Sequence, residues 1–527
     1  MKYRVLVSDP LAEEGIEILK GFADVDVNTG LTEDQLVASI GNYDALLVRS
    51  GTEVTARVID AGAKLKFIGR AGAGVDNIDT DAATRRGIIV ANAPEGNTLA
   101  ATEHTMAMML SLARNIPQAT ASLKKGEWKR SKFMGVELND KILGIMGFGR
   151  IGREVAKRAQ AMDMKIIAYD PFITQEKAAS LGVEMVPLDE LFRRADVITV
   201  HTPLIKETRH VINAETIATM KDGVRLINCA RGGIIDEKAL ADGIASGKVA
   251  GAALDVFESE PPTDSPVLGL DRVIVTPHLG ASTVEAQQNV AISVANQCIS
   301  VLSGGAAKYV VNAPMIPAEQ QALVEPYAVL AQKMGRLLIQ LTEGRLESIK
   351  ITYGGEAAAL PNTKFVTRVI LKGMLDPILQ APVNIVNAEF VAKERGIRLS
   401  ETTTEEAHGF RNIISITAKT DKMTESVSGS VSAPDHARIV SIGGYLTDLT
   451  PTGHVVISRH TDKPGIIGKA ATILGRVNVN IAGMQVGRHK PGQEALMVLT
   501  VDSAVPTEAM DEIEKIDGIH TVKHAEI

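Results

Sequence analysis

Three polar residues in the middle of the chain have side chains suited to proton transfer and to binding an organic acid. Arg231 lies in Cys-Ala-Arg-Gly-Gly, Glu260 in Glu-Ser-Glu-Pro-Pro and His278 in Thr-Pro-His-Leu-Gly, and each follows an apolar run that predicts a strand. Since the carboxyl ends of parallel strands lie along one edge of a sheet, we expect these side chains to meet there. An imidazole exchanges a proton with a hydroxyl or carbonyl oxygen, a carboxylate beside it orients it, and a guanidinium binds a substrate carboxylate. Each residue alone could be a solvated loop side chain, but the three together suit hydride transfer to a 2-oxo acid.

A glycine-rich turn upstream predicts the dinucleotide site that this chemistry requires. Ile142 to Met146 form a short apolar run, and Gly147-x-Gly149-x-x-Gly152 follows directly, before a helical stretch. Strand, glycine turn and helix in this order bind a pyrophosphate at the amino end of the helix. A second apolar run ends at Asp170, about 20 residues beyond the glycines, as a dinucleotide fingerprint requires. A carboxylate there accepts hydrogen bonds from the ribose hydroxyls and repels a 2′-phosphate, so we predict NAD rather than NADP.

Composition limits the classes of protein to consider. The chain has 527 residues, 45% of them hydrophobic, and a formal net charge of −7, which predicts several domains and argues against a nucleic-acid partner. The amino terminus enters a predicted strand directly, and no apolar run approaches the roughly 18 residues of a membrane span. The only cysteines, Cys229 and Cys298, indicate a reducing compartment. We therefore expect a soluble cytoplasmic protein without a metal site.

The predicted elements divide the chain into α/β and α+β units. In the first hundred residues, strands predicted at 3–8, 25–28, 45–48, 65–68 and 88–90 alternate with helices, as in a flavodoxin-like parallel sheet. The alternation resumes at Lys141 in a longer, Rossmann-type form. A helical pattern over 283–302 could return the chain to the first unit, so that the nucleotide domain is inserted in the substrate domain. The expected boundaries are 1–97 with 290–317 for the substrate-binding domain, 98–289 for the NAD-binding domain, 318–452 for an intervening α+β domain and 453–527 for a β-α-β-β-α-β, ferredoxin-like domain.

With these motifs in view, the first part of the chain resembles the D-isomer-specific 2-hydroxyacid dehydrogenases. The resemblance covers about residues 1–317 and rests on four motifs: Gly-Arg-Ala-Gly-Ala-Gly-Val-Asp-Asn-Ile-Asp (69–79), Gly-Phe-Gly-Arg-Ile-Gly (147–152), Asn-Cys-Ala-Arg-Gly-Gly-Ile-Ile-Asp (228–236) and Thr-Pro-His-Leu-Gly-Ala-Ser-Thr (276–283). With two further units at its end, the chain is similar to the long-chain members of this family. That similarity implies oxidation of 3-phosphoglycerate to 3-phosphohydroxypyruvate, the first step of serine synthesis, by a homotetramer.

The resemblance also implies roles for individual residues. Arg231, Glu260 and His278 would be catalytic, with His278 as proton donor and acceptor. Matches to the family's NAD contacts, together with the fingerprint, are Gly147, Gly149, Arg150, Ile151, Gly152, Asp170, Thr202, Cys229, Ala230, Arg231, Asp255, His278, Leu279, Gly280 and Ala281. Matches to the loops that hold the substrate's carboxylate and phosphate are Arg49, Ser50, Gly72, Ala73, Gly74 and Asn97.

The final unit resembles an ACT domain, a small-molecule regulatory module. Its signature is Arg-His-Thr-Asp-Lys-Pro-Gly (459–465) with Val-Asn-Ile-Ala-Gly (479–483). The resemblance implies that His460, Asp462 and Asn480 bind L-serine as an effector between two paired domains. The alternative is that this unit only dimerises, by pairing of edge strands.

Two other functions remain open at this point. One is a glyoxylate or hydroxypyruvate reductase, although such enzymes usually lack the C-terminal units. The other is a dinucleotide-sensing scaffold, because some transcriptional corepressors have the dehydrogenase fold with its Arg/Glu/His set. Amino-acid feedback through an ACT-like domain favours a biosynthetic enzyme over both.

Overall fold

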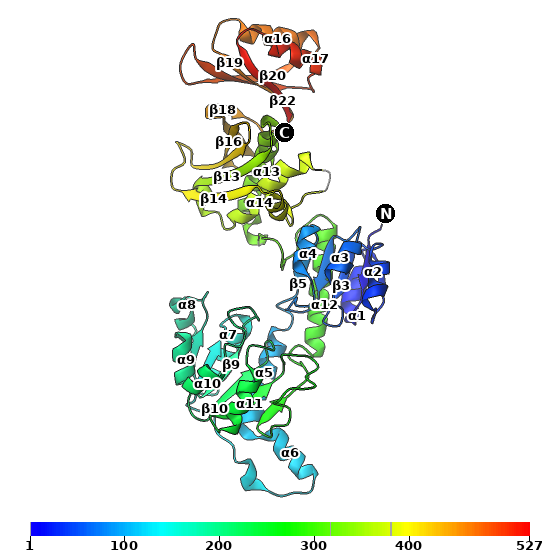
Figure 1. Ribbon diagram of the computed structural model, residues 1–527, viewed down its shortest axis with the longest axis vertical. Coiled ribbons are helices and arrows are strands. Elements are labelled where there is room, and N and C mark those ends of the chain that lie inside the picture. The colour runs from blue at the N-terminus through cyan, green and yellow to red at the C-terminus, as the bar shows by residue number, and fades with distance from the viewer. Residues whose placement is uncertain (1, 317, 380–381) are drawn as a thin grey trace.

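The computed structural model describes residues 2–316, 318–379 and 382–527 and arranges them as four units along one long axis (Figure 1). The second unit lies at one end, the first next to it, and the third and fourth follow toward the other end. The α/β class with an intervening and a ferredoxin-like unit is as predicted. No helix within the described ranges is long and apolar enough to cross a membrane.

The first unit is a parallel sheet in the flavodoxin-like order β2-β1-β3-β4-β5. Alternate residues of each strand point to opposite faces, so Val5 and Val7 enter one core while Leu6 enters the other. Its strands are β1 (Arg4–Val7), β2 (Asp24–Val27), β3 (Ala45–Val48), β4 (Phe67–Arg70) and β5 (Ile89–Asn92). Its helices are α1 (Glu13–Lys20), α2 (Glu33–Ile40), α3 (Ala56–Ala61) and α4 (Thr80–Arg85).

The strand predicted at 65–68 was placed two residues too early. Leu65 is buried in a turn, where its N–H bonds to the Gly62 carbonyl, so its hydrophobicity does not mark a strand. The strand instead continues to Arg70, which pairs with Val48 of β3. Backbone pairing, and not side-chain hydrophobicity, sets the end of β4, and this carries an arginine to the carboxyl edge of the sheet.

The second unit is a seven-stranded parallel sheet in the order β12-β11-β10-β9-β6-β7-β8. The chain starts at β6 and builds outward in both directions, so the sheet has a switch point between β6 and β9, where ligands bind in such folds. Its strands are β6 (Ile142–Met146), β7 (Lys165–Tyr169), β8 (Glu184–Met185), β9 (Val197–Val200), β10 (Val224–Asn228), β11 (Val249–Leu254) and β12 (Val273–Val275). Its helices are α7 (Arg150–Gln160), α8 (Gln175–Ala179), α9 (Leu188–Arg194), α10 (Ala214–Thr219) and α11 (Glu237–Ala245).

Two long helices connect these units. Helix α5 (Thr98–Arg114) leaves the first unit and buries Met106 and Met109 in a core of the second. Helix α12 (Val284–Leu302) begins at the Thr283 cap and buries Val290 and Val294 against the first sheet, as its predicted return to that unit requires. Helix α6 (Ile116–Lys124) and the short η1 (Arg130–Phe133) follow α5 and project at the lower end of Figure 1.

The third unit has a mixed sheet in the order β14-β13-β15-β16-β17-β18, in which only the β13–β14 pair is parallel. Its strands are β13 (Leu346–Gly355), β14 (Arg398–Thr404), β15 (Asn412–Thr420), β16 (Thr424–Ala433), β17 (His436–Ile442) and β18 (Tyr445–Leu449). Its helices are α13 (Ala318–Leu341), η2 (Glu356–Ala359), α14 (Thr363–Leu375), η3 (Asp376–Ile378) and α15 (Ala388–Glu394).

The fourth unit has the predicted ferredoxin-like order, with an antiparallel sheet β20-β21-β19-β22. Its elements are β19 (His454–Thr461), α16 (Ile466–Arg476), β20 (Ile481–Arg488), β21 (Glu494–Val501), α17 (Thr507–Glu514) and β22 (Ile519–Glu526). One face of the sheet, with Val456, lies under the two helices. The other face, with Val455 and Ile457, belongs to the same hydrophobic core as the third unit.

Candidate active site

The glycine turn after β6 has the geometry of a pyrophosphate site. Gly147 has a φ of 94°, and a Cβ added there would lie 2.7 Å from the His201 carbonyl oxygen. A Cβ on Gly152 would lie 2.2 Å from the carbonyl oxygen of Gly147, so helix α7 packs directly on the turn. A Cβ on Gly149 would meet no atom of the chain within 4 Å, so this glycine faces open space at the amino end of α7. Two of the glycines thus serve the protein's own packing, and the middle one leaves room for a ligand.

Two polar groups beside this turn fit a bound dinucleotide. The Asp170 carboxylate accepts the Phe148 N–H at 2.9 Å on one oxygen and the Phe172 N–H at 2.9 Å on the other. Each carboxylate oxygen keeps a second lone pair that can accept a ribose hydroxyl. The Thr202 hydroxyl is buried and has no hydrogen-bond partner among the described residues, while its methyl group lies near Gly147. A buried hydroxyl without a partner is costly unless a ligand supplies one.

His278 and Glu260 form a hydrogen-bonded pair. His278 Nδ1 lies 2.8 Å from Glu260 Oε2, and the other carboxylate oxygen accepts the Phe257 N–H at 3.2 Å. Burial, the largest single influence, raises the pKa of Glu260, but the hydrogen bond and charge of His278 and the Phe257 N–H together outweigh it and leave the pKa below its ordinary value. An ionised carboxylate can only accept, so Nδ1 carries a hydrogen and Nε2 remains free to exchange a proton with a substrate.

Arg231 links the first and second units at the carboxyl edge of the second sheet. Its Nε donates to Asp76 of the first unit at 3.0 Å, and its Nη1 donates to the Ala230 carbonyl at 2.7 Å. A Cβ on Gly74 would lie 1.9 Å from Arg231 Nη2, so only glycine allows this approach. The predicted substrate loop, which contains Gly72, Ala73 and Gly74, therefore lies against the predicted catalytic arginine.

Sequence reasoning missed Arg70, which the structure places beside this loop. A Cβ on Gly72 would lie 1.7 Å from an Arg70 guanidinium nitrogen. Burial, with the nearby positive charge of Arg231 second, lowers the pKa of Arg70 to about 10. The charge of Arg49 acts on Arg70 in the same direction, so three guanidinium groups lie near one another. Its place in the sequence could have identified Arg70, since it ends a strand and directly precedes the Ala-Gly-Ala-Gly loop.

Arg49 is held in this cluster by a residue that the sequence did not single out. The buried Asp9 carboxylate, at the end of β1, accepts the Arg49 N–H at 2.6 Å and both the N–H and the hydroxyl of Thr52. The Arg49 side chain reaches the Pro10 carbonyl at 3.4 Å. Ser50 is exposed on the same loop.

Three other predicted site residues lie near the junction of the first and second units or beside the loop after β10. Asn97 caps α5 and has a buried Oδ1 that accepts no hydrogen bond among the described residues. Arg150, at the start of α7, lies 3.8 Å from Glu95 of the first lobe. Burial raises the pKa of the Cys229 thiol to about 12, so this cysteine stays protonated beside the site.

The rest of the predicted cofactor set divides between the glycine helix and the loops after β10, β11 and β12. Asp255 is only 1% exposed and points into the protein, where it accepts the N–H groups of Leu279 and Gly280. Ile151 packs on the core beneath α7. The Ala230 N–H and the Ala281 carbonyl make internal bonds that shape their loops.

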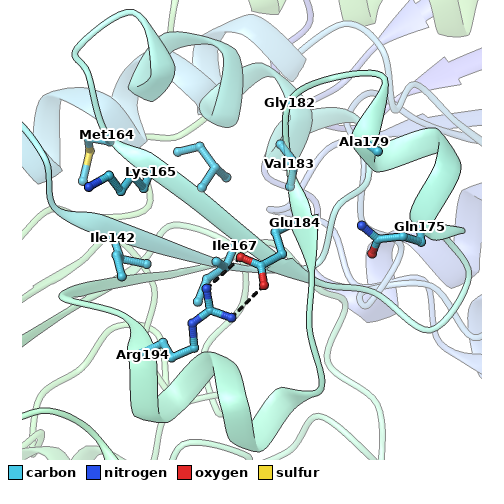
Figure 2. A pocket seen from close by; sticks show the side chains of 11 residues that line it. Ile142, Met164, Lys165, Ile167, Gln175, Ala179, Gly182, Val183, Glu184 and Arg194 are labelled. Carbon is cyan, nitrogen blue, oxygen red and sulfur yellow. Dashed lines mark hydrogen bonds and ion pairs between the residues drawn. The ribbon is translucent and has the colours of Figure 1, made fainter.

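Two cavities lie in the second unit. The first, of about 340 Å³, is mostly apolar and borders Glu260 and His278. The second, of about 560 Å³, opens near Ile142 and Lys165 at the amino ends of β6 and β7 (Figure 2). Its wall carries the paired Arg194 and Glu184. Since ligands bind at the carboxyl edge of such sheets, only the first cavity belongs to the candidate site.

Two of the three predicted effector residues, Asp462 and Asn480, are hydrogen-bonded within their own chain. Asp462 accepts Arg488 at 2.7 Å, and that hydrogen bond lowers the pKa of the carboxyl. Asn480 donates to Asp502 at 2.7 Å. His460 is 1% exposed in β19, and its Nδ1 has no partner among the described residues.

Comparison with known proteins gives three family matches along the chain. The NAD binding domain of the D-isomer specific 2-hydroxyacid dehydrogenases matches residues 106–280. The D-3-phosphoglycerate dehydrogenase intervening domain matches residues 323–443, and the ACT domain matches residues 454–518. The first and third of these matches are the families that the sequence resemblance predicted for the second and fourth units.

Similar proteins match over both lobes or over the whole chain. The D-lactate dehydrogenase from Aquifex aeolicus complexed with NAD and lactic acid is 30% identical, with a TM-score of 0.54, over 59% of this chain and 100% of that one. The D-3-phosphoglycerate dehydrogenase of Methanocaldococcus jannaschii is 49% identical over 98% of this chain and 99% of its own length. That of Bacillus subtilis is 46% identical over 99% of both chains. The chain therefore belongs to the D-3-phosphoglycerate dehydrogenases of the D-isomer-specific 2-hydroxyacid dehydrogenase family.

Proposed function

We propose that this chain oxidises 3-phospho-D-glycerate to 3-phosphohydroxypyruvate with NAD, the first step of L-serine biosynthesis. The observation that carries the proposal is that the His278–Glu260 pair and Arg231 follow neighbouring strands of one sheet, and that Arg231 reaches Asp76 of the first unit near Arg70 and Arg49. A substrate with one carboxylate and one phosphate brings about three negative charges to this site, which a cluster of guanidinium groups can bind.

In the proposed reaction the residues bind the acid and move one proton. Arg231 binds the substrate carboxylate and polarises the carbonyl as it forms, and Arg49 and Arg70 bind the phosphate. His278 Nε2 accepts the proton of the C2 hydroxyl as the C2–H bond breaks, and Glu260 stabilises the imidazolium. A bound NAD would supply the acceptor for the hydride that leaves C2. In the reverse direction His278 returns the proton to the carbonyl oxygen.

The proposed NAD site uses the glycine turn and the polar groups beside it. The amino end of α7 faces the pyrophosphate, and Asp170 accepts the adenosine ribose hydroxyls. The domain boundaries that we propose are those predicted from the sequence. The substrate site would lie between the substrate-binding domain, residues 1–97 and 290–317, and the NAD-binding domain, residues 98–289.

We also propose L-serine as an effector of a cytoplasmic homotetramer. Asp462 and Asn480 lie at the two ends of the α16 segment, on the loops before the helix and before β20. Paired ACT units could place Asp462 of one chain near the amide of the other, so that a small zwitterion is held between a carboxylate and an amide. An effector that binds across two chains favours one arrangement of the assembly and so acts on distant sites.

The test of the catalytic proposal is a panel of initial rates. The intact chain is assayed with NAD and with NADP on 3-phosphoglycerate, glycerate, D-lactate and glycolate, and in reverse on the corresponding oxo acids. We expect kcat/KM to be highest for 3-phosphoglycerate with NAD. A preference for glyoxylate or unphosphorylated hydroxypyruvate would instead identify a reductase, and NAD binding without turnover of any acid would identify a dinucleotide-sensing scaffold.

A further inference from the structure

A buried hydrogen-bond network lies directly behind the loop that carries His278. Its centre is Asp255, whose side chain is 1% exposed. Asp255 Oδ1 accepts the Thr276 hydroxyl at 2.6 Å and the Leu279 N–H at 2.7 Å, and Oδ2 accepts the Gly280 N–H at 2.8 Å. The His278 N–H donates to the backbone carbonyl of the same aspartate at 2.8 Å. One carboxylate and its own backbone thus fix the loop on both sides of the imidazole.

Two side chains of α5 reach this network: the sulfur of Met108 lies 4.0 Å from the Thr276 hydroxyl oxygen, and His104 reaches the Asp255 carboxylate itself. Its Nε2 lies 3.1 Å from Asp255 Oδ1 and 3.2 Å from the Thr276 hydroxyl oxygen. Because the threonine hydrogen is already directed to the carboxylate, both atoms act as acceptors, and His104 Nε2 must be the donor. Burial, the largest single influence, raises the pKa of Asp255, but the hydrogen bonds from His104, Thr276 and the Leu279 N–H together with the charge of His104 outweigh it and leave the pKa below its ordinary value.

The loop needs this external support because its backbone is strained at the reacting residue. His278 has a φ of 54°, in the left-handed region that side chains other than glycine rarely adopt. Such a conformation persists only where the surroundings enforce it. The carboxylate of Asp255 supplies that restraint, and His104 connects the carboxylate to the helix that begins where the chain first crosses between the lobes.

We propose that His104 is a positioning residue for proton transfer, acting through Asp255 on the loop of His278. The inference rests on the proposed function only in taking His278 as the acid/base. Loss of the His104 hydrogen bond leaves a buried charge with one donor fewer, and the loop relaxes to restore its solvation. A small displacement of the imidazole from the C2 hydroxyl then lowers the rate of the chemical step, because proton transfer requires the two atoms within hydrogen-bond reach.

The experiment compares three variants of the full-length chain. His104→Leu removes the donor, while His104→Gln places an amide N–H near the position of Nε2. Thr102→Val is the matched control, since Thr102 is fully buried on the same helix and its hydroxyl bonds only to the Thr98 carbonyl among the described residues. Rates are measured with 3-phosphoglycerate and with its 2-deuterated form, and NAD affinity is measured by calorimetry.

We expect His104→Leu to lower kcat about tenfold, as the loss of one hydrogen bond to a charged group implies, and to raise the primary deuterium isotope effect. His104→Gln should recover most of kcat, and Thr102→Val should match the parent chain in both measurements. If the leucine variant does not fold, His104→Asn, whose amide is too short to reach Asp255, takes its place. Equal rates in the leucine variant and the control, or a glutamine variant as impaired as leucine, would overturn the role of His104. An unaltered chain that does not turn over 3-phosphoglycerate would overturn the proposed function as well.

Discussion

Replacement of Glu260 by glutamine isolates the contribution of one charge to the acid/base pair. The parent carboxylate accepts hydrogens on both sides, from Phe257 N–H and from His278 Nδ1. A glutamine has one oxygen and one NH₂ group, so it cannot satisfy both donors. If its oxygen stays on Phe257, its NH₂ faces Nδ1 and favours the tautomer in which Nε2 already carries hydrogen. That tautomer cannot accept a proton from the substrate.

The size of the effect follows from the geometry of the pair. A hydrogen bond between charged groups contributes about 1.5–3 kcal/mol, and partial exposure of both side chains places this pair at the lower end. About 1.5 kcal/mol corresponds to roughly a tenfold loss of kcat/KM. The loss is expected in the chemical step, because the carboxylate stabilises the imidazolium that forms when His278 accepts the substrate proton.

The assay is kcat/KM for 3-phosphoglycerate oxidation, measured at one pH in the parent chain and in Glu260→Gln. Glu258→Gln is the control, because Glu258 lies two residues away on the same loop and is 3.1 Å from a different imidazole, that of His210. We expect the control to keep the kcat/KM of the parent. A Glu260→Gln variant with the same kcat/KM as the parent would refute the assignment of Glu260 and His278 as an acid/base pair.

Three further predictions test the cofactor, substrate and effector sites. Asp170→Ala should weaken NAD binding and reduce the ratio of kcat/KM for NAD over NADP at least several-fold, because the ribose acceptor and the repulsion of a 2′-phosphate are lost together; an unchanged ratio would contradict this. Arg49→Leu should raise KM for 3-phosphoglycerate about tenfold or more, and much less for unphosphorylated glycerate, since a charge-assisted bond to phosphate is lost; equal losses on both acids would remove Arg49 from the phosphate site. Asp462→Ala and Asn480→Ala should each relieve inhibition by L-serine and leave uninhibited turnover unchanged, and calorimetric titration of the intact chain that finds no serine binding at millimolar concentrations would reject feedback through this domain.

The sequence allowed correct prediction of features that depend only on residues close together in the chain. The glycine turn at Gly147 depends only on neighbouring residues, and the structure has it where it was predicted. The edge of the second sheet was also predictable, because a strand followed by a polar loop places Arg231 and His278 at known ends of parallel strands.

Residues that depend on distant partners were not predictable in this way. Asp9 meets Thr52, and His104 meets Asp255, only after two separate elements have packed. Neither has a pattern of its own in the chain. Arg70 was overlooked for a different reason, since hydrophobicity ended the predicted strand at residue 68 while backbone pairing extends it to 70.

The hydrophobic core that the third and fourth units share determines how the end of the chain responds to excision, heating and ligand binding. Arg459 is paired with the buried Glu425 at 2.7 Å, and Gln340 exchanges two hydrogen bonds with the backbone of Glu526, so polar contacts close the same junction that Val455 lines. Excision at residue 453 would expose an apolar sheet face and leave a buried glutamate without its arginine, so the last domain is not a detachable module. The two units should therefore unfold in one cooperative transition. A ligand that displaces the terminal sheet should move residues 318–452 with it, because the two units share one core.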